Sequence, residues 1–233
     1  MTGVNKMPRA DSSRLAEILV ASGMKSGAKL SDVYEVCSEA LKHGVRKVCI
    51  PTVYLREASM FTKDTGLKIS TVISFPTGLL PVELKMMEMR LASEQGVEEA
   101  YFYPNIGDYL DSRILEFEWE LSRILEESQL IGLNHVTPVL ETGFLTEKQL
   151  VEIVGIMEAS GLDTLAISSG FGLKNMEGDE LKLLKTIGES IAVEAHCRVG
   201  SLQEVQKLID NRVSRVCTVD YRLVLEEGFK QKV

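Results

Sequence analysis

The sequence predicts an α/β protein that folds as a single (β/α)8 TIM barrel. Short runs rich in β-branched residues alternate with longer amphipathic stretches along the 233 residues. Such alternation is typical of parallel strands joined by right-handed helical crossovers. Eight strand–helix units fit this length, and no glycine-rich dinucleotide fingerprint follows the first strand. We therefore expect a closed barrel rather than an open doubly wound sheet.

The predicted strands are short apolar runs of four to seven residues, which is strand length rather than helix length. A longer N-terminal segment over residues 18–25 could supply an eighth strand ahead of them. The other seven occupy residues 47–50, 68–74, 99–103, 135–140, 164–168, 191–195 and 215–219.

The predicted helices have apolar residues at helical spacing. They cover residues 31–43, 80–95, 110–127, 147–160, 178–188, 201–211 and 221–231. In the second of these, Leu84, Met87 and Leu91 share one face, which we expect to be buried. Thr146 is placed to cap one helix, and Ser201 has Glu204 three residues later, a capping-box spacing. Glycines 44, 96 and 161 stand where helices should end.

Composition excludes several classes of protein. The 26 basic and 34 acidic residues give a net charge of −8, which argues against nucleic-acid binding. No apolar run is long enough to span a membrane, and the first residues lack the apolar core of a secretory signal. The cysteines 37, 49, 197 and 217 are scattered, as in a reducing compartment. We expect a cytoplasmic protein with one domain over residues 1–233, which includes a short N-terminal extension over about residues 1–12.

Four ordered motifs at the predicted strand ends resemble the deoxyribose-phosphate aldolase family. They are TVISFPTGLLPVELKMMEMRLA at residues 71–92, NIG at 105–107, LETGFLT at 140–146 and SSGFG at 168–172. The resemblance extends over about residues 15–223 and implies an aldolase-type lyase barrel with its site at the carboxyl ends of the strands. Fold alone does not carry activity, so each residue must be compared.

The residues that the family uses for chemistry are replaced. The resemblance places the Schiff-base lysine at Ala166 and the second lysine, which lowers the pKa of the first, at Glu194. It places the acidic proton relay at Tyr101 and a further lysine at Thr137. Alanine cannot form a Schiff base, so we expect that chemistry to be lost.

The phosphate-binding residues implied by the resemblance also differ. A Gly-Gly pair reads Cys197-Arg198, and a serine pair reads Val219-Asp220. Ser169 and Gly170 match the remainder of that cradle, and Cys49 matches a pocket cysteine of the family. We expect an ion pair between Arg198 and Asp220, which makes 2-deoxyribose 5-phosphate an unfavourable ligand.

Alternate residues of a strand face the same side, so Glu194 and His196 should both point into the barrel. We hypothesise that they act as an acid–base pair, with Tyr101, on a small carbonyl or sugar-like substrate. Such a protein would be a lyase, isomerase or cyclase without a covalent intermediate. The residues expected to bind the substrate are Thr137, Ser168, Ser169, Gly170, Arg198, Asp220 and Cys49.

Other hypotheses stay open. Glu194, His196, Asp220 and His135 could hold a divalent metal, although we expect no cofactor. Cys197 could be a nucleophile beside His196.

Lys25 or Lys174 could reach the mouth and restore an aldolase. In the inactive alternative, the charged groups pair with one another and fill the cavity of a binding or scaffold protein. We expect a small-molecule ligand and no nucleic-acid or membrane partner, and we leave a homodimer open.

Overall fold

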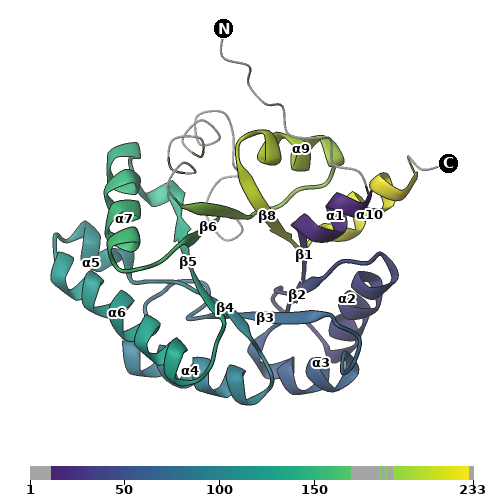
Figure 1. Ribbon diagram of the computed structural model, residues 1–233, viewed down its shortest axis with the longest axis horizontal. Coiled ribbons are helices and arrows are strands. Elements are labelled where there is room, and N and C mark those ends of the chain that lie inside the picture. Colours follow the sequence, from purple (N-terminus) through teal and green to yellow (C-terminus); the bar gives the residue numbers. More distant parts are fainter. Residues whose placement is uncertain (1–11, 169–183, 185–186, 188–190, 231–233) are drawn as a thin grey trace, which may run out of the picture.

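The computed structural model describes residues 12–168, 184, 187 and 191–230. Eight parallel strands form a closed barrel in the order of the sequence, as predicted (Figure 1). Each strand pairs with the next, and β1 pairs with β8 to close the ring. The strands are β1 Leu19–Ser22, β2 Lys47–Cys49, β3 Lys68–Ile73, β4 Glu99–Phe102, β5 His135–Glu141, β6 Thr164–Ser168, β7 Ala192–His196 and β8 Val213–Thr218.

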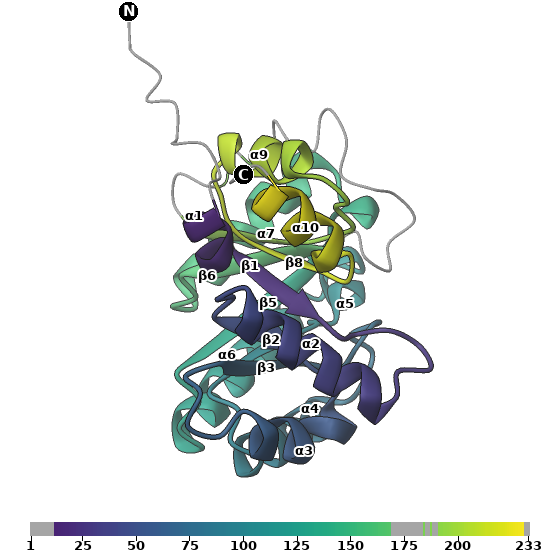
Figure 2. The ribbon, with the colours of Figure 1, turned by 90° about the vertical axis from the view of Figure 1, so that its right-hand side faces the viewer.

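Helices surround the barrel and cover its outer face (Figure 1). They are α1 Ser12–Ile18, α2 Leu30–Lys42, α3 Leu55–Phe61, α4 Val82–Glu94, α5 Ile106–Leu110, α6 Ile114–Leu130, α7 Glu147–Ala159, α9 Leu202–Asp210 and α10 Tyr221–Lys230, with short 3-10 turns at Thr52–Tyr54 and Thr142–Phe144. Helices α1 and α10, from the two ends of the chain, lie side by side (Figures 1 and 2).

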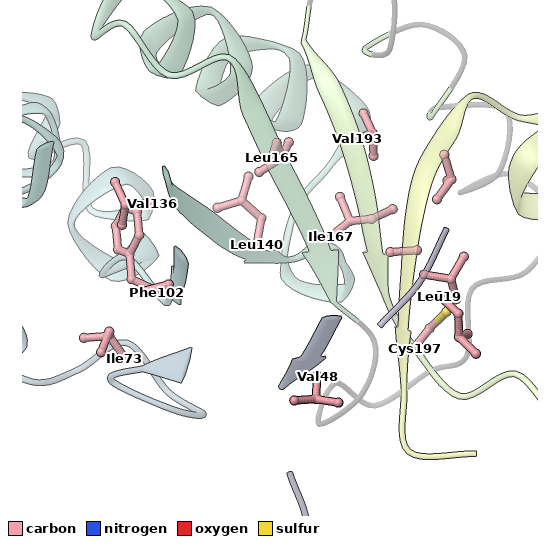
Figure 3. Packing of buried hydrophobic residues seen from close by; sticks show 14 of the residues in the cluster. Leu19, Val48, Ile73, Phe102, Val136, Leu140, Leu165, Ile167, Val193 and Cys197 are labelled. Atoms are coloured by element: carbon pink, nitrogen blue, oxygen red, sulfur yellow. The ribbon is translucent and has the colours of Figure 1, made fainter. Parts of the chain in front are cut away.

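The main hydrophobic core lies between the outer face of the barrel and the helices. Leu19, Phe102 and Ile167 point outward from their strands into this layer (Figure 3). Because strand residues alternate in direction, the neighbouring positions point into the barrel. The inner face holds a second, smaller cluster together with polar and charged side chains.

The prediction of which face of α4 is buried is wrong. Leu84, Met87 and Leu91 do share one face, but that face is exposed: their exposed fractions are 47%, 57% and 49%. The helix instead buries Met89 and Lys85 against the barrel. Both faces of α4 carry apolar residues, so periodicity alone could not identify the face that is buried.

Other boundaries were predicted closely. Thr146 caps α7 in a capping box with Gln149, and Gly44, Gly96 and Gly161 adopt positive φ after their helices. The predicted helix over residues 110–127 corresponds to α6, which begins at Ile114 and ends at Leu130. Helix α5, which begins where Asn105 accepts a hydrogen bond from the Gly107 amide, precedes it and was not predicted. Helices α1 and α3 were not predicted.

The helix predicted over residues 178–188 lies outside the described residues except at positions 184 and 187, and most of the predicted N-terminal extension also lies outside them. Within the described ranges, no helix has the length and apolar character that crossing a membrane requires.

Candidate functional site

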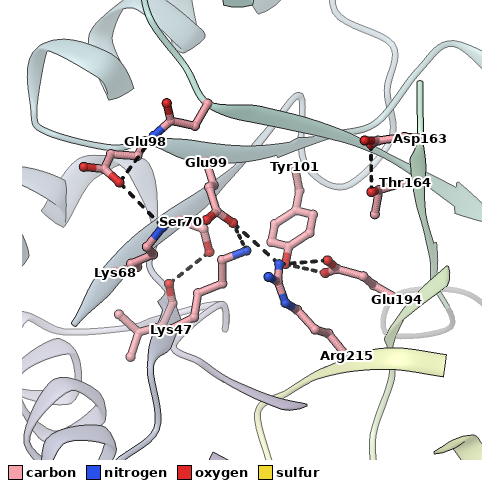
Figure 4. Close-up of polar contacts among 12 residues, drawn as sticks. Lys47, Lys68, Ser70, Glu98, Glu99, Tyr101, Asp163, Thr164, Glu194 and Arg215 are labelled. Atoms are coloured by element: carbon pink, nitrogen blue, oxygen red, sulfur yellow. Dashed lines mark hydrogen bonds and ion pairs between the residues drawn. The ribbon is translucent and has the colours of Figure 1, made fainter. Parts of the chain in front are cut away.

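A charged layer fills the lower interior of the barrel, toward the amino-terminal ends of the strands. Lys47 of β2 pairs with the Glu99 carboxylate of β4, and Arg215 of β8 lies 3.6 Å from the same carboxylate (Figure 4). Arg215 also donates to Glu194 of β7 at 3.1 Å, and the Tyr101 hydroxyl donates to Glu194 at 2.7 Å. Each carboxylate in this layer therefore has a cationic partner.

Burial dominates the electrostatics of this layer. Desolvation raises the pKa of Tyr101 well above its ordinary value, and the neighbouring Glu194 carboxylate raises it further. Tyr101 therefore stays a hydroxyl group and donates its proton to Glu194. Desolvation also raises the pKa of Glu99, but the charges of Lys47 and Arg215 outweigh it and hold that pKa below its ordinary value. The paired charges satisfy one another, as buried charges require.

An open cavity of about 230 Å³ lies above this layer, at the carboxyl ends of the strands. This is the face at which barrels of this fold place their sites. The lining is mostly apolar, with a few polar side chains. The lining residues are Ser22, Met24, Lys25, Ser26, Cys49, Val72, Phe75, Tyr103, His196, Cys197, Arg198, Cys217 and Val219.

His196 is the central polar group of this cavity. Its side chain is 9% exposed, and its Nε2 atom has no hydrogen-bond partner among the described residues. The imidazole packs edge-on against the Tyr101 ring, with the ring centroids 4.3 Å apart. Burial, and then the charge of Lys47, lower the pKa of His196 to about 3. The imidazole is therefore neutral at physiological pH and presents an unsatisfied nitrogen.

Two cysteines of the cavity lining, Cys197 and Cys217, are thiols. Hydrogen bonding to Cys49, together with burial, raises the pKa of Cys217 well above its ordinary value. Burial raises the pKa of Cys197 to about 12, and its side chain packs in the outer core (Figure 3). Since the thiolate is the nucleophile, the hypothesis of a Cys197 nucleophile is not supported.

Ion pairs surround the rim of the cavity. Arg198 binds Asp220 through two hydrogen bonds of 2.9 Å, as predicted. Lys25 lies 3.3 Å from Asp32, and its side chain is 55% exposed. The rim cations that line the cavity, Lys25 and Arg198, therefore both have carboxylate partners among the described residues.

The predicted site residues separate into two levels. His196, Cys49 and Arg198 line the cavity, and Asp220 holds Arg198 at its rim. Glu194, Tyr101 and Thr137 point into the barrel but lie in the layer below, so the predicted acid–base pair does not share one open cavity.

The backbone of Ser168 pairs with His196 at the end of β6, and its side chain lies outside the described structure. Ser169, Gly170 and Lys174 also lie outside the described residues.

The predicted metal ligands do not come together. His135 is exposed at the amino-terminal end of β5, opposite the mouth, and Asp220 binds Arg198. The described part of the chain contains no group of three His, Cys, Asp or Glu side chains placed to hold a metal ion.

Sequence reasoning missed several residues of this interior, including Lys47 and Arg215 of the charged layer and Cys217, Ser22 and Tyr103 of the cavity. A signal for them was present. Lys47 precedes Cys49 by two residues, and Arg215 precedes Cys217 by two, as Glu194 precedes His196. The period of two places each charged residue one level below a cavity residue.

Comparisons with known proteins agree with this architecture. A deoxyribose-phosphate aldolase from Lactococcus lactis subsp. cremoris is 31% identical over 196 residues, covering 83% of this chain and 87% of the relative. Another, from Mycoplasmopsis pulmonis, is 27% identical over 196 residues, covering 84% and 88%. A tetrameric deoxyribose phosphate aldolase structure from Aeropyrum pernix superposes with a TM-score of 0.82 at 23% identity, covering 95% of this chain and 93% of that one. No family model matches the chain.

Proposed function

The chain belongs to the deoxyribose-phosphate aldolase family, and from this premise we propose that it binds a small uncharged carbonyl compound over His196 and acts on it without a Schiff base. The Nε2 atom of His196 carries the proposal because it is buried, lines the cavity and lacks a hydrogen-bond partner among the described residues. A buried polar atom without a partner costs free energy, and a ligand oxygen would remove that cost.

The lysines of the chain support a mechanism without a Schiff base. By the motif resemblance, Ala166 stands where the family carries its reactive lysine, and its side chain is fully buried in the inner cluster. Lys25 is exposed and paired with Asp32, whereas a Schiff-base lysine needs a desolvated, neutral amine. Lys47 is buried below Tyr101, pairs with Glu99 and does not line the cavity.

The proposed chemistry is polarisation of a carbonyl group by a neutral imidazole. With a pKa of about 3, His196 is a weak base but can donate a hydrogen bond from Nε2 to a carbonyl oxygen. That bond stabilises the negative charge that develops on the oxygen when the α-carbon loses its proton to solvent. Enolisation of this kind underlies lyase and isomerase reactions. Tyr101 is a positioning residue, because its ring packs against the imidazole from below, and Glu194 acts through Tyr101 by accepting the hydrogen bond of its hydroxyl.

A binding protein without catalysis is the second candidate, and one observation favours it. Three carboxylates in the charged layer and at the rim could serve as bases. Each of them already pairs with a cation: Glu99, Glu194 and Asp220. In this alternative His196 recognises a carbonyl or hydroxyl group but promotes no proton transfer.

Exchange of the α-protons of propanone in D2O, followed by proton NMR, separates these functions. We expect the protein to accelerate exchange above the buffer rate, and His196→Ala to lose about 100-fold of that acceleration, the usual effect of removing one such donor. Lys25→Met should retain it. Binding of propanone without accelerated exchange would favour the binding protein. Acceleration that requires Lys25 and survives His196→Ala would contradict the proposal.

A further inference from the structure

A second hollow lies beside the His196 cavity, at the same face of the barrel. It is a groove of about 440 Å³ between the loops that follow β3, β4 and β5. Leu79, Ile106, Leu110 and Phe144 line its sides, and the inward-facing Val139 of β5 lies at its base. Leu79 and Phe144 are 67% and 56% exposed, so the groove presents an apolar surface to solvent. Exposed apolar surface of this kind commonly marks a binding site.

The groove and the cavity are neighbours. Tyr103 lines both of them, and its ring packs edge-on against Phe75 at a centroid distance of 5.8 Å. The Tyr103 hydroxyl donates to Glu141 at 3.3 Å. The two hollows thus meet at Tyr103, with His196 in the lining of one and Leu110 in the lining of the other.

Buried contacts hold the walls of the groove in place. The Lys85 ammonium pairs with Glu120 and donates to the carbonyl oxygens of Gly78 and Tyr103, at 2.5 and 2.9 Å. A side chain at position 78 would bring its Cβ within 2.4 Å of the Pro104 carbonyl oxygen, so only glycine allows the two loops to approach so closely. The groove is thus formed before a ligand binds.

Charge selects the class of ligand that fits. No cationic side chain lines the groove among the described residues, and its ionisable lining group, Glu141, is a carboxylate. A phosphate group would meet neither a cation nor a favourable field there. An apolar chain would instead remove the exposed surfaces of Leu79, Leu110 and Phe144 from water.

We infer that this groove binds an apolar tail of the ligand whose oxygen contacts His196. The substrate class is accordingly an uncharged carbonyl or hydroxyl compound with a chain of several carbons, rather than a sugar phosphate. The position of the ligand's polar end rests on the proposed function. The position of its apolar tail rests on the groove alone.

Straight-chain 1-alkanols, from 1-propanol to 1-octanol, test the groove separately from the chemistry, because they bind but cannot enolise. Affinity measured by ligand-observed NMR should rise about two- to fourfold for each added methylene. We call this gain in affinity per methylene the increment, and Leu110→Asp and Phe144→Asp should each reduce it to nearly onefold. Both side chains are exposed, so the variants should fold. Leu115→Asp on α6, which is 78% exposed and outside the groove, is the matched control and should retain the increment.

His196→Ala distinguishes the two parts of the account, because it should weaken every alkanol by a similar factor and leave the increment unchanged. An increment that is absent from the wild-type protein, or that survives both groove variants, would overturn the inference. A change of molecular mass by light scattering in Phe144→Asp, with the increment intact, would assign the groove to contact between copies of the chain and overturn it as well. If the increment holds while propanone exchange is absent, the groove stands and the proposed catalysis fails.

Discussion

The two levels of the barrel interior differ in how their polar groups are satisfied. In the lower level, Glu194 and Glu99 each bind cations, and Tyr101 donates to Glu194. In the upper level, a mostly apolar cavity surrounds His196, whose Nε2 atom has no partner among the described residues. The lower level holds more charged side chains, but only the upper level combines open space with a polar atom that lacks a partner among the described residues. Titratable groups on strands indicate a functional site only when they also face open space.

The largest expected effect comes from breaking the lower level. Glu194→Ala leaves the buried Tyr101 hydroxyl without its acceptor and leaves Arg215, which is 42% exposed, with Glu99 as its remaining carboxylate partner, so we expect the free energy of unfolding to fall by about 2–3 kcal/mol in urea denaturation. Combining Glu194→Leu with Arg215→Leu should recover much of this loss, because the cation that loses Glu194 is removed as well. A loss near zero for Glu194→Ala would show that the pairing does not support the barrel.

A smaller effect should appear when stability is measured against pH. The unfolded chain protonates His196 near pH 6.5, but the folded chain does so only near pH 3. Below pH 6.5 the unfolded state therefore binds more protons, and stability falls as the pH falls. The contribution of His196 approaches about 1.4 kcal/mol per pH unit toward pH 5.

Chemical denaturation between pH 7 and pH 5 measures this slope, and His196→Gln should reduce it. His135→Gln, at the exposed opposite end of β5, is the control and should not. Equal slopes in wild type and His196→Gln would mean that the imidazole takes up its proton at the same pH in the folded and unfolded chain, which would contradict a lowered pKa.

The smallest effect should come from the rim. Arg198→Met removes a well-formed ion pair with Asp220, but the Arg198 side chain is 65% exposed and solvent screens the interaction. We expect no measurable change in the denaturation midpoint at neutral pH. A clear loss of stability, comparable to that of Glu194→Ala, would remove the distinction between rim and interior.

The sequence was sufficient to predict the barrel, because alternating strand and helix patterns are local signals. It also predicted that Glu194 and His196 share a face, and that Arg198 pairs with Asp220. The neutralisation of Glu194 by a cation could not be predicted, since it depends on which strand places a basic residue opposite Glu194. Arg215 is 21 residues away along the chain and reaches Glu194 only through the pairing of β7 with β8.

The groove was also beyond sequence reasoning. Leu79, Leu110 and Phe144 come from the segments that follow three different strands, and no periodic pattern connects them. The exposed face of α4 shows the same limit, because apolar residues at helical spacing indicate a face but not its partner. Packing between elements distant in sequence decided both cases.

Reductive trapping tests the central claim most directly, which is that this member of the family binds its ligand without an amine. The protein is incubated with propanal and sodium borohydride, and the adducts are mapped by peptide mass spectrometry. We predict no stoichiometric adduct on any lysine that reaches the cavity, Lys25 included. A single stoichiometric adduct on Lys25 or Lys47, prevented by a competing ligand, would contradict the account.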